Sequence, residues 1–156
     1  YIPETNEEVP NFIFRSKIGK FDQFDWSNDY GILPTVPTAI KAFAGKIFAW
    51  DRNNTYIINA SDLRVMDTIE GTGCIGPRAV VVTDFGMAFF DDSNVYLHNG
   101  QSAQPIAMTI QKSNSGFTGW KDRENKDNLS ITYSADKKQF IIFEASKLVP
   151  YSTGER

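Results

Sequence analysis

The sequence predicts an all-β protein made of antiparallel four-stranded repeat units of about 40 residues, arranged as a partial β-propeller. Three observations predict this class: an internal repeat, short apolar runs rich in β-branched residues, and a scarcity of helical periodicity. A ring of blades usually needs at least four units, so we expect other chains or further sequence to complete it. A β-sandwich, or an open stack of antiparallel sheets, is the alternative architecture.

The internal repeat relates two neighbouring segments of the chain. Residues 37–59 align without a gap on residues 77–99, which is a shift of 40 positions. Matched positions keep their chemical type; they include Trp50 with Phe90, Asp51 with Asp91, Asn54 with Asn94, Tyr56 with Tyr96, and Asn59 with Asn99. We therefore expect both segments to adopt one strand order.

Each unit is expected to contain four short strands. In the first unit they lie near residues 38–43, 46–51, 55–59 and 63–69, and in the second near 78–84, 86–91, 94–98 and 104–110. The apolar β-branched run that ends at Thr83 is typical of a strand buried on both faces. The period-2 pattern of Leu63, Val65 and Ile69 places these three side chains on one face of the fourth strand.

Polar clusters separate the central strands of each unit. Residues 51–54 and 91–94 supply the Asp, Asn and Ser side chains that favour tight turns, so both clusters predict hairpins. Their oxygens are also the ligands that calcium prefers, but their spacing is not that of a calcium-binding loop. Turn chemistry explains both clusters without a metal.

The rest of the chain divides into an N-terminal arm, a third partial unit and a tail. Residues 1–36 are expected to form an irregular arm with a possible strand at 11–14, residues 37–149 the β-repeat domain, and residues 150–156 a flexible tail. Within the domain, residues 129–133 and 139–143 indicate a third hairpin, preceded by an exposed polar loop at 121–127. The first residue is not Met, which is typical of a fragment or a processed product.

Composition excludes several classes of function. The net charge of −3 gives no basic surplus for phosphate contacts, so no nucleic-acid partner is expected. With one Cys and one His, the chain cannot form an internal disulfide or a Cys-based zinc site. No apolar stretch is long enough for membrane insertion. We expect no enzyme activity, no catalytic residues, no cofactor and no metal.

The single His and the single Cys have structural interpretations. His98 stands at a strand end, where hydrogen bonding to the backbone is the simplest role. Cys74 lies in the Gly-rich run 71–76, which favours a small buried side chain in a connection between units. That run has no Lys-Ser/Thr after it, so it is not a phosphate-binding loop.

The repeat resembles a family of viral proteins. The resemblance is carried by residues 71–100, which include Val80-Val-Val-Thr83, Gly86-Met87 and Asn94-Val-Tyr-Leu-His-Asn-Gly100, and by residues 45–59. These phrases resemble the propeller-like repeats of virion structural proteins of tailed bacteriophages, particularly tail components. The resemblance implies a virion protein of the tail, without catalytic residues, that acts by assembly with copies of itself and other virion proteins.

Two other functions remain open. One is a receptor- or carbohydrate-binding module of a tail fibre, with a host surface receptor as partner and exposed aromatic residues beside Asp or Asn. The other is a fragment of a propeller hydrolase, which would need carboxylates that converge in a pocket.

Candidate partner contacts lie in two segments. Aromatic residues in the N-terminal arm need another surface to cover them if the arm has little core of its own; they are Phe21, Phe24 and Trp26. The polar loop supplies the others: Lys121, Asp122, Arg123 and Glu124. Phe12, Phe14 and Trp120 could add to an aromatic docking surface, whereas the repeat match assigns Trp50 to the core.

Overall fold

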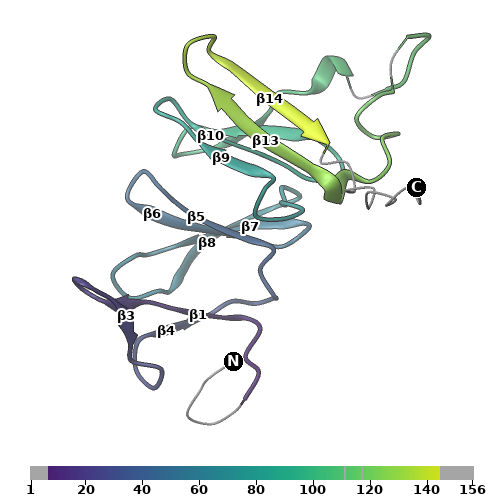
Figure 1. Ribbon diagram of the computed structural model, residues 1–156. Helices are drawn as coiled ribbons and strands as arrows, with labels where there is room; N and C mark the ends of the chain where they lie inside the picture. Colours follow the sequence, from purple (N-terminus) through teal and green to yellow (C-terminus); the bar gives the residue numbers. More distant parts are fainter. Residues whose placement is uncertain (1–6, 111, 117, 145–156) are drawn as a thin grey trace, which may run out of the picture.

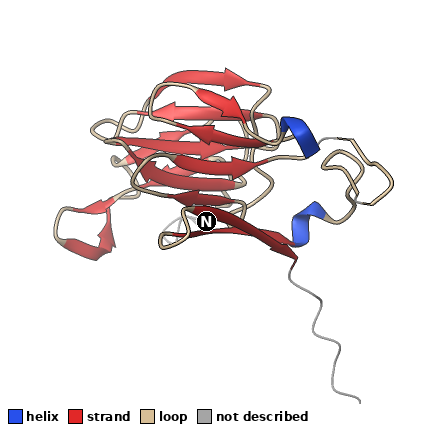
Figure 2. Ribbon diagram, turned by 90° about the horizontal axis from the view of Figure 1, so that it is seen from above, coloured by secondary structure: helices blue, strands red, loops and turns tan. Residues whose placement is uncertain are grey.

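The protein is all-β, as the sequence predicts. The computed structural model describes residues 7–110, 112–116 and 118–144, and within them regular structure consists of short strands and two 3-10 helices of three residues each. All strand pairs are antiparallel. The sheets lie face to face in an open stack, and no sheet in these ranges closes on itself (Figures 1 and 2).

Two four-stranded sheets form the centre of the stack. The first has the order β5-β6-β7-β8 and consists of Ala39–Phe43, Lys46–Trp50, Asn54–Ile58 and Val65–Glu70. The second has the order β9-β10-β11-β12 and consists of Val80–Val82, Met87–Phe90, Val95–His98 and Ala103–Pro105. The two predicted units are therefore present, with four strands each.

Strand register confirms the internal repeat residue by residue. Ala49 pairs with Tyr56 in the first sheet, and Phe89 pairs with Tyr96 in the second. Likewise Trp50 pairs with Thr55, and the equivalent Phe90 pairs with Val95. Equivalent residues thus hold equivalent places in the two sheets.

The main core lies on both faces of the second sheet. Alternate side chains of a strand point to opposite faces. The ring centroids of Phe89 and of Trp50 in the first sheet lie 5.3 Å apart. Phe90 points the other way, and its ring centroid lies 5.3 Å from that of Trp120. Trp50 is fully buried, which confirms its predicted core position.

A two-stranded layer covers the far face of the second sheet. It consists of β13 (Leu129–Ser134) and β14 (Gln139–Glu144), and the N–H of Ile131 donates to the carbonyl of Arg78 at 2.9 Å. This is the predicted third hairpin. Residues 145–149 of the expected domain and the expected tail at 150–156 lie outside the described residues.

The N-terminal segment contains more regular structure than the expected irregular arm. Strands β1 (Phe12–Phe14) and β4 (Tyr30–Ile32) pair with each other and cover the first sheet, and β2 (Ser16–Lys17) and β3 (Lys20–Phe24) form a separate hairpin. Of these four strands only β1 was predicted, as a possible strand at 11–14. Ile13 and Leu33 are buried in a second core cluster with residues of the first sheet, so this layer shares a core with that sheet.

Arg15 joins this N-terminal layer to the first sheet. Its guanidinium donates to the carboxylate of Asp29 at 2.6 Å and to the carbonyls of Ala60 and Ser61 at 2.6 and 3.0 Å. Arg15 thus makes four hydrogen bonds across two layers.

Three strand predictions are wrong in detail. The segment 104–110 is a strand only to Pro105, and Met108–Ile110 is a 3-10 helix (η1). Val82 is 40% exposed because β9 is an edge strand, so it is not buried on both faces. A register shift between Ile57 and Ile58 reverses the faces of β8, so Val65 joins one core cluster and Ile69 the other.

Candidate functional site

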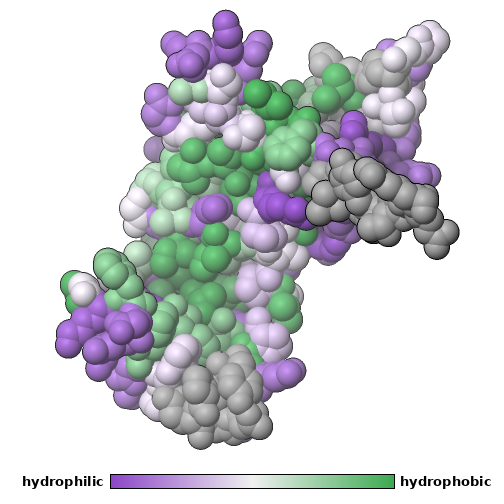
Figure 3. Space-filling model, in the orientation of Figure 1, coloured by the Kyte–Doolittle hydropathy of each residue, from purple (hydrophilic) through white to green (hydrophobic). Residues whose placement is uncertain are grey.

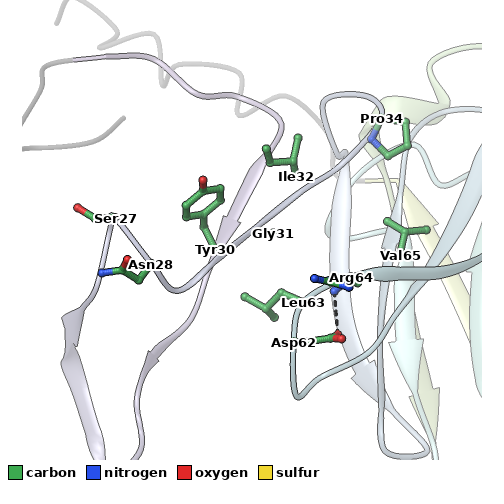
Figure 4. Close-up of a pocket in the computed structure, with 10 residues that line it drawn as sticks. All are labelled: Ser27, Asn28, Tyr30, Gly31, Ile32, Pro34, Asp62, Leu63, Arg64 and Val65. Carbon is green, nitrogen blue, oxygen red and sulfur yellow. Dashed lines mark hydrogen bonds between the residues drawn. The ribbon is translucent and has the colours of Figure 1, made fainter.

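The groove in Figure 4 runs beside β4, at the edge of the N-terminal layer. It measures about 680 Å³ and is open to solvent. Its walls come from the 27–28 turn, from β4 and Pro34, and from the loop that leads into β8; the lining residues are Ser27, Asn28, Tyr30, Gly31, Ile32, Pro34, Asp62, Leu63, Arg64 and Val65. The groove therefore combines one aromatic ring with amide, carboxylate and guanidinium groups.

Gly31 explains how β4 comes so close to this loop. A Cβ atom at Gly31 would overlap the carbonyl oxygen of Leu63 and lie 2.9 Å from its Cβ, so only glycine fits there. Leu63 itself has a positive φ of 57° and is buried beneath β4. The floor of the groove is thus a backbone contact between the N-terminal layer and the first sheet.

Aromatic rings gather around the outer face of the β1–β4 layer. We call them the aromatic surface: Phe12, Phe14, Phe24, Trp26 and Tyr30. Phe24 stacks on Trp26 with centroids 4.9 Å apart, and Phe12 stacks on Tyr30 at 5.1 Å. Two of the predicted contact residues, Phe24 and Trp26, therefore belong to this surface. Phe12 and Phe14 were considered from the sequence as additions to it, and Tyr30 was not.

Phe21 lies apart from that cluster, on the β2–β3 hairpin. It is 88% exposed, and Ile18 at the turn is completely exposed. The hairpin projects from the stack in both Figure 1 and Figure 2. We call residues 17–21 the hairpin tip. Sequence reasoning missed Ile18, although Gly19 after it, with a φ of 71°, is typical of a tight turn that exposes its neighbours.

The predicted polar loop lies at the opposite side of the molecule and is partly ordered by its own contacts. The carboxylate of Asp122 accepts hydrogen bonds from the backbone N–H and hydroxyl of Ser113, at 3.0 and 2.6 Å, which lowers its pKa. Arg123 donates to Glu144 at 3.3 Å. Lys121 and Glu124 are exposed. A 3-10 helix (η2, Lys126–Asn128) overlaps the end of the expected loop.

Two adjoining hollows border this loop, and we call them together the C-terminal groove. One, of about 400 Å³, is lined by Ile110, Thr118, Trp120, Arg123 and Ile142. The other, of about 510 Å³, is lined by Thr118, Asp122, Arg123, Glu124, Asn125 and Glu144. Trp120 is only 5% exposed and its Nε1 donates to the carbonyl of Asp91 at 3.1 Å, so it is a core residue and not a docking surface.

The Asp turns are held by protein donors. Oδ1 of Asp51 accepts hydrogen bonds from the N–H groups of Asn53 and Asn54 at 2.7 and 2.6 Å, and Asp91 accepts equivalent bonds from Ser93 and Asn94. Within the described ranges, no group of three or more His, Cys, Asp or Glu side chains is placed to hold a metal ion. Both predicted hairpin turns are therefore present.

The carboxyl group of Asp51 has a strongly lowered pKa. Burial raises its pKa, but hydrogen bonds from the Tyr56 hydroxyl, the Asn53 and Asn54 N–H groups and the Thr35 hydroxyl outweigh this and lower it to about 2. The Tyr56 and Thr35 bonds measure 2.6 and 2.8 Å. The ionised carboxylate is therefore a structural element of the turn.

His98 and Cys74 occupy buried positions. Nδ1 of His98 accepts a hydrogen bond from the N–H of Gly100 at 2.9 Å, and its ring packs edge-on against Phe48 at 4.9 Å. Burial raises the pKa of Cys74 to about 12, which keeps the thiol protonated and unreactive at neutral pH. Both side chains have the structural roles that the sequence predicts.

Comparison with known proteins adds no assignment to this geometry. No protein-family model matches the chain, and no curated protein sequence matches it. Among the described residues, none belongs to a helix that is long and apolar enough to cross a membrane.

Proposed function

We propose that this protein is a structural component of a bacteriophage virion, associated with the tail, and that it acts by subunit assembly. The observation that carries the assembly part is the exposure of apolar side chains at both ends of the stack. Ile32 is 54% exposed at the N-terminal end, and Ile141 and Phe143 are 46% and 49% exposed on β14. Apolar faces of this kind mark sites of protein association.

The sheets inside the stack bury the same kind of surface that its ends expose. Each four-stranded sheet covers the apolar face of its neighbour, whereas the end layers have only two strands each. On the face shown in Figure 3, apolar residues form a band along the stacked sheets and hydrophilic residues gather at the hairpin ends. Further subunits would cover what the end layers leave open.

The tail is the setting that the repeat resemblance supports. Residues 71–100 and 45–59 carry that resemblance, and the residue-by-residue register of the two sheets supports their interpretation as copies of one unit. Particles of the phage that encodes this sequence can be separated into tails and heads and digested for mass spectrometry. Peptides of this chain at stoichiometric levels in the tail fraction support the proposal, and their absence from intact particles contradicts it.

The assembly part has a separate test on the purified chain. Light scattering of the native protein should give a mass well above the 17.6 kDa of one chain. A stable monomer at all concentrations would contradict self-assembly.

A second candidate function is carbohydrate binding at a host receptor, and the groove of Figure 4 favours it. Tyr30 lines this groove beside Asn28 and Asp62, which is the pairing of aromatic ring and polar oxygens that this function requires. A glycan array should then give hits that Tyr30→Ala and Asp62→Asn remove. Asp67→Asn is the matched control, because Asp67 also accepts a bond from a nearby backbone N–H but lies outside the groove.

A further inference from the structure

We infer that copies of this chain join head to tail, with the hairpin tip of one copy bound in the C-terminal groove of the next. The inference rests on the proposed function, because it names one contact of that assembly in addition to the exposed end layers. It depends on three properties of these two surfaces: exposed apolar area, complementary charge and position in the stack.

The hairpin tip is an apolar projection with a basic border. Ile18 is fully exposed and Phe21 is 88% exposed, which are the two highest values among the large apolar side chains of the described residues. Lys17 and Lys20 pair across the turn and flank both of them. Two exposed apolar side chains on a projecting hairpin gain free energy when a concave apolar surface covers them.

The C-terminal groove is an apolar hollow with an acidic border. Ile110, 45% exposed, lies in its apolar part with Ile142. Its polar part carries three carboxylates and one guanidinium: Asp122, Glu124, Glu144 and Arg123. The C-terminal groove is therefore complementary to the hairpin tip, because its apolar part can cover the apolar side chains of the tip and its carboxylates can pair with the two lysines.

The positions of the two surfaces determine the type of assembly. The hairpin leaves the N-terminal layer on one side of the stack, and the segment that contains η1 and η2 lies on the opposite side at the other end (Figures 1 and 2). One copy therefore cannot fill its own groove. Contacts between two different patches are heterologous, and they generate a closed ring or an open filament.

The first test removes the apolar contact. Phe21→Ser should raise the concentration needed for half-assembly by at least about tenfold, measured by sedimentation velocity. Met66→Ser is the matched control, because Met66 is 59% exposed on β8 and belongs to neither surface. Since all these side chains are exposed, circular dichroism should show an unchanged fold.

The second test exchanges the charges. Lys17→Glu/Lys20→Glu reverses the charge of the tip, and Glu124→Lys/Glu144→Lys reverses the charge of the groove, so each double variant alone should assemble less than the wild type. An equimolar mixture should assemble again, because the acidic tip of one variant fits the basic groove of the other and their unchanged surfaces also match.

The outcomes separate this inference from the proposed function. Wild-type protein that stays monomeric at every concentration contradicts both self-assembly and the head-to-tail contact. Two results would overturn the head-to-tail contact alone when the wild-type protein assembles. One is that Phe21→Ser assembles equally well, and the other is that the mixture of charge variants does not recover assembly. Loss with each variant and recovery in the mixture supports it.

Discussion

Nη1 of Arg52 lies 3.2 Å from Oδ2 of Asp92, the residue that occupies the same position in the next repeat. Nη2 of the same side chain donates to Asp127 at 2.6 Å, so one guanidinium joins both four-stranded sheets to the 3-10 helix η2. A strict repeat would place like charges at these equivalent positions. The opposite charges convert a repulsion between layers into an attraction.

Arg52→Ala is expected to lower the free energy of unfolding by about 1 kcal/mol, because exposed ion pairs contribute little individually but this side chain makes two. Urea denaturation at low and high salt measures the effect, and high salt should reduce it. Arg78→Ala is the control, since the side chain of Arg78 is exposed and makes no ion pair in the described residues. Equal losses in both variants would contradict a role for the ion pairs.

Asp51 should make the fold sensitive to acid. Its pKa falls from 3.8 to about 2 in the folded protein, so between these values the unfolded chain binds more protons. The stabilisation is complete above about pH 4 and disappears as the pH falls through about 2. It amounts to about 1 kcal/mol once solvent screening of this partly exposed group is allowed for.

Urea midpoints of wild type and Asp51→Asn at pH 7 and near pH 2 measure this contribution. The variant should lose stability at pH 7 and depend less on pH in the acid range. Tyr56→Phe removes the largest favourable hydrogen bond to Asp51 and should raise the pKa of this carboxyl. An acid transition that is identical in all three proteins would contradict the assignment.

Much of the fold could be predicted from the sequence, because the repeat carries its own evidence. Because the strand pattern recurs after 40 residues, the sequence predicts the same register in both sheets. The equivalent pairs Ala49–Tyr56 and Phe89–Tyr96 confirm this. The failures occur where local pattern and global packing differ. The period of β8 could not reveal the register shift at Ile57–Ile58, because the extra residue looks like any other member of the strand.

The candidate site was harder to predict, because it depends on residues distant in sequence. The sequence identified the polar loop and Phe21 as exposed contact candidates, but it did not show which residues surround them. The C-terminal groove needs Ile110 and Ile142, which lie on either side of the loop in sequence, and the groove of Figure 4 needs Asp62 beside Tyr30. Sequence spacing alone does not predict that such residues lie together, because only the stacking of the sheets places them side by side.

Gly73 is expected to tolerate no side chain. A Cβ there would overlap the carbonyl of Arg52 and lie 2.5 Å from the backbone N of Asn53, neither of which can move without breaking the Asp51 turn. Gly73→Ala should therefore cost several kcal/mol, at the upper end of about 1–3 kcal/mol for an overpacked site or beyond it. Gly76→Ala is the matched control, since nothing lies within 4 Å of its Cβ position. Thermal denaturation of the two variants compares them, and similar midpoints would contradict the close approach.

His98 should titrate below its ordinary value and reduce stability in mild acid. Burial, and to a lesser degree the charge of Lys46, lowers its pKa below 6.5, so the folded protein binds fewer protons than the unfolded chain just below that pH. Stability is therefore constant above about pH 6.5 and falls as the pH decreases toward the folded pKa. As the sequence has one His, the imidazole proton signals in NMR report this group alone. Lys46→Met should raise the pKa toward 6.5 without reaching it, because burial is the larger cause. A titration midpoint at or above 6.5 in the wild type would show that the ring is hydrated and that the two sheets pack less closely around it.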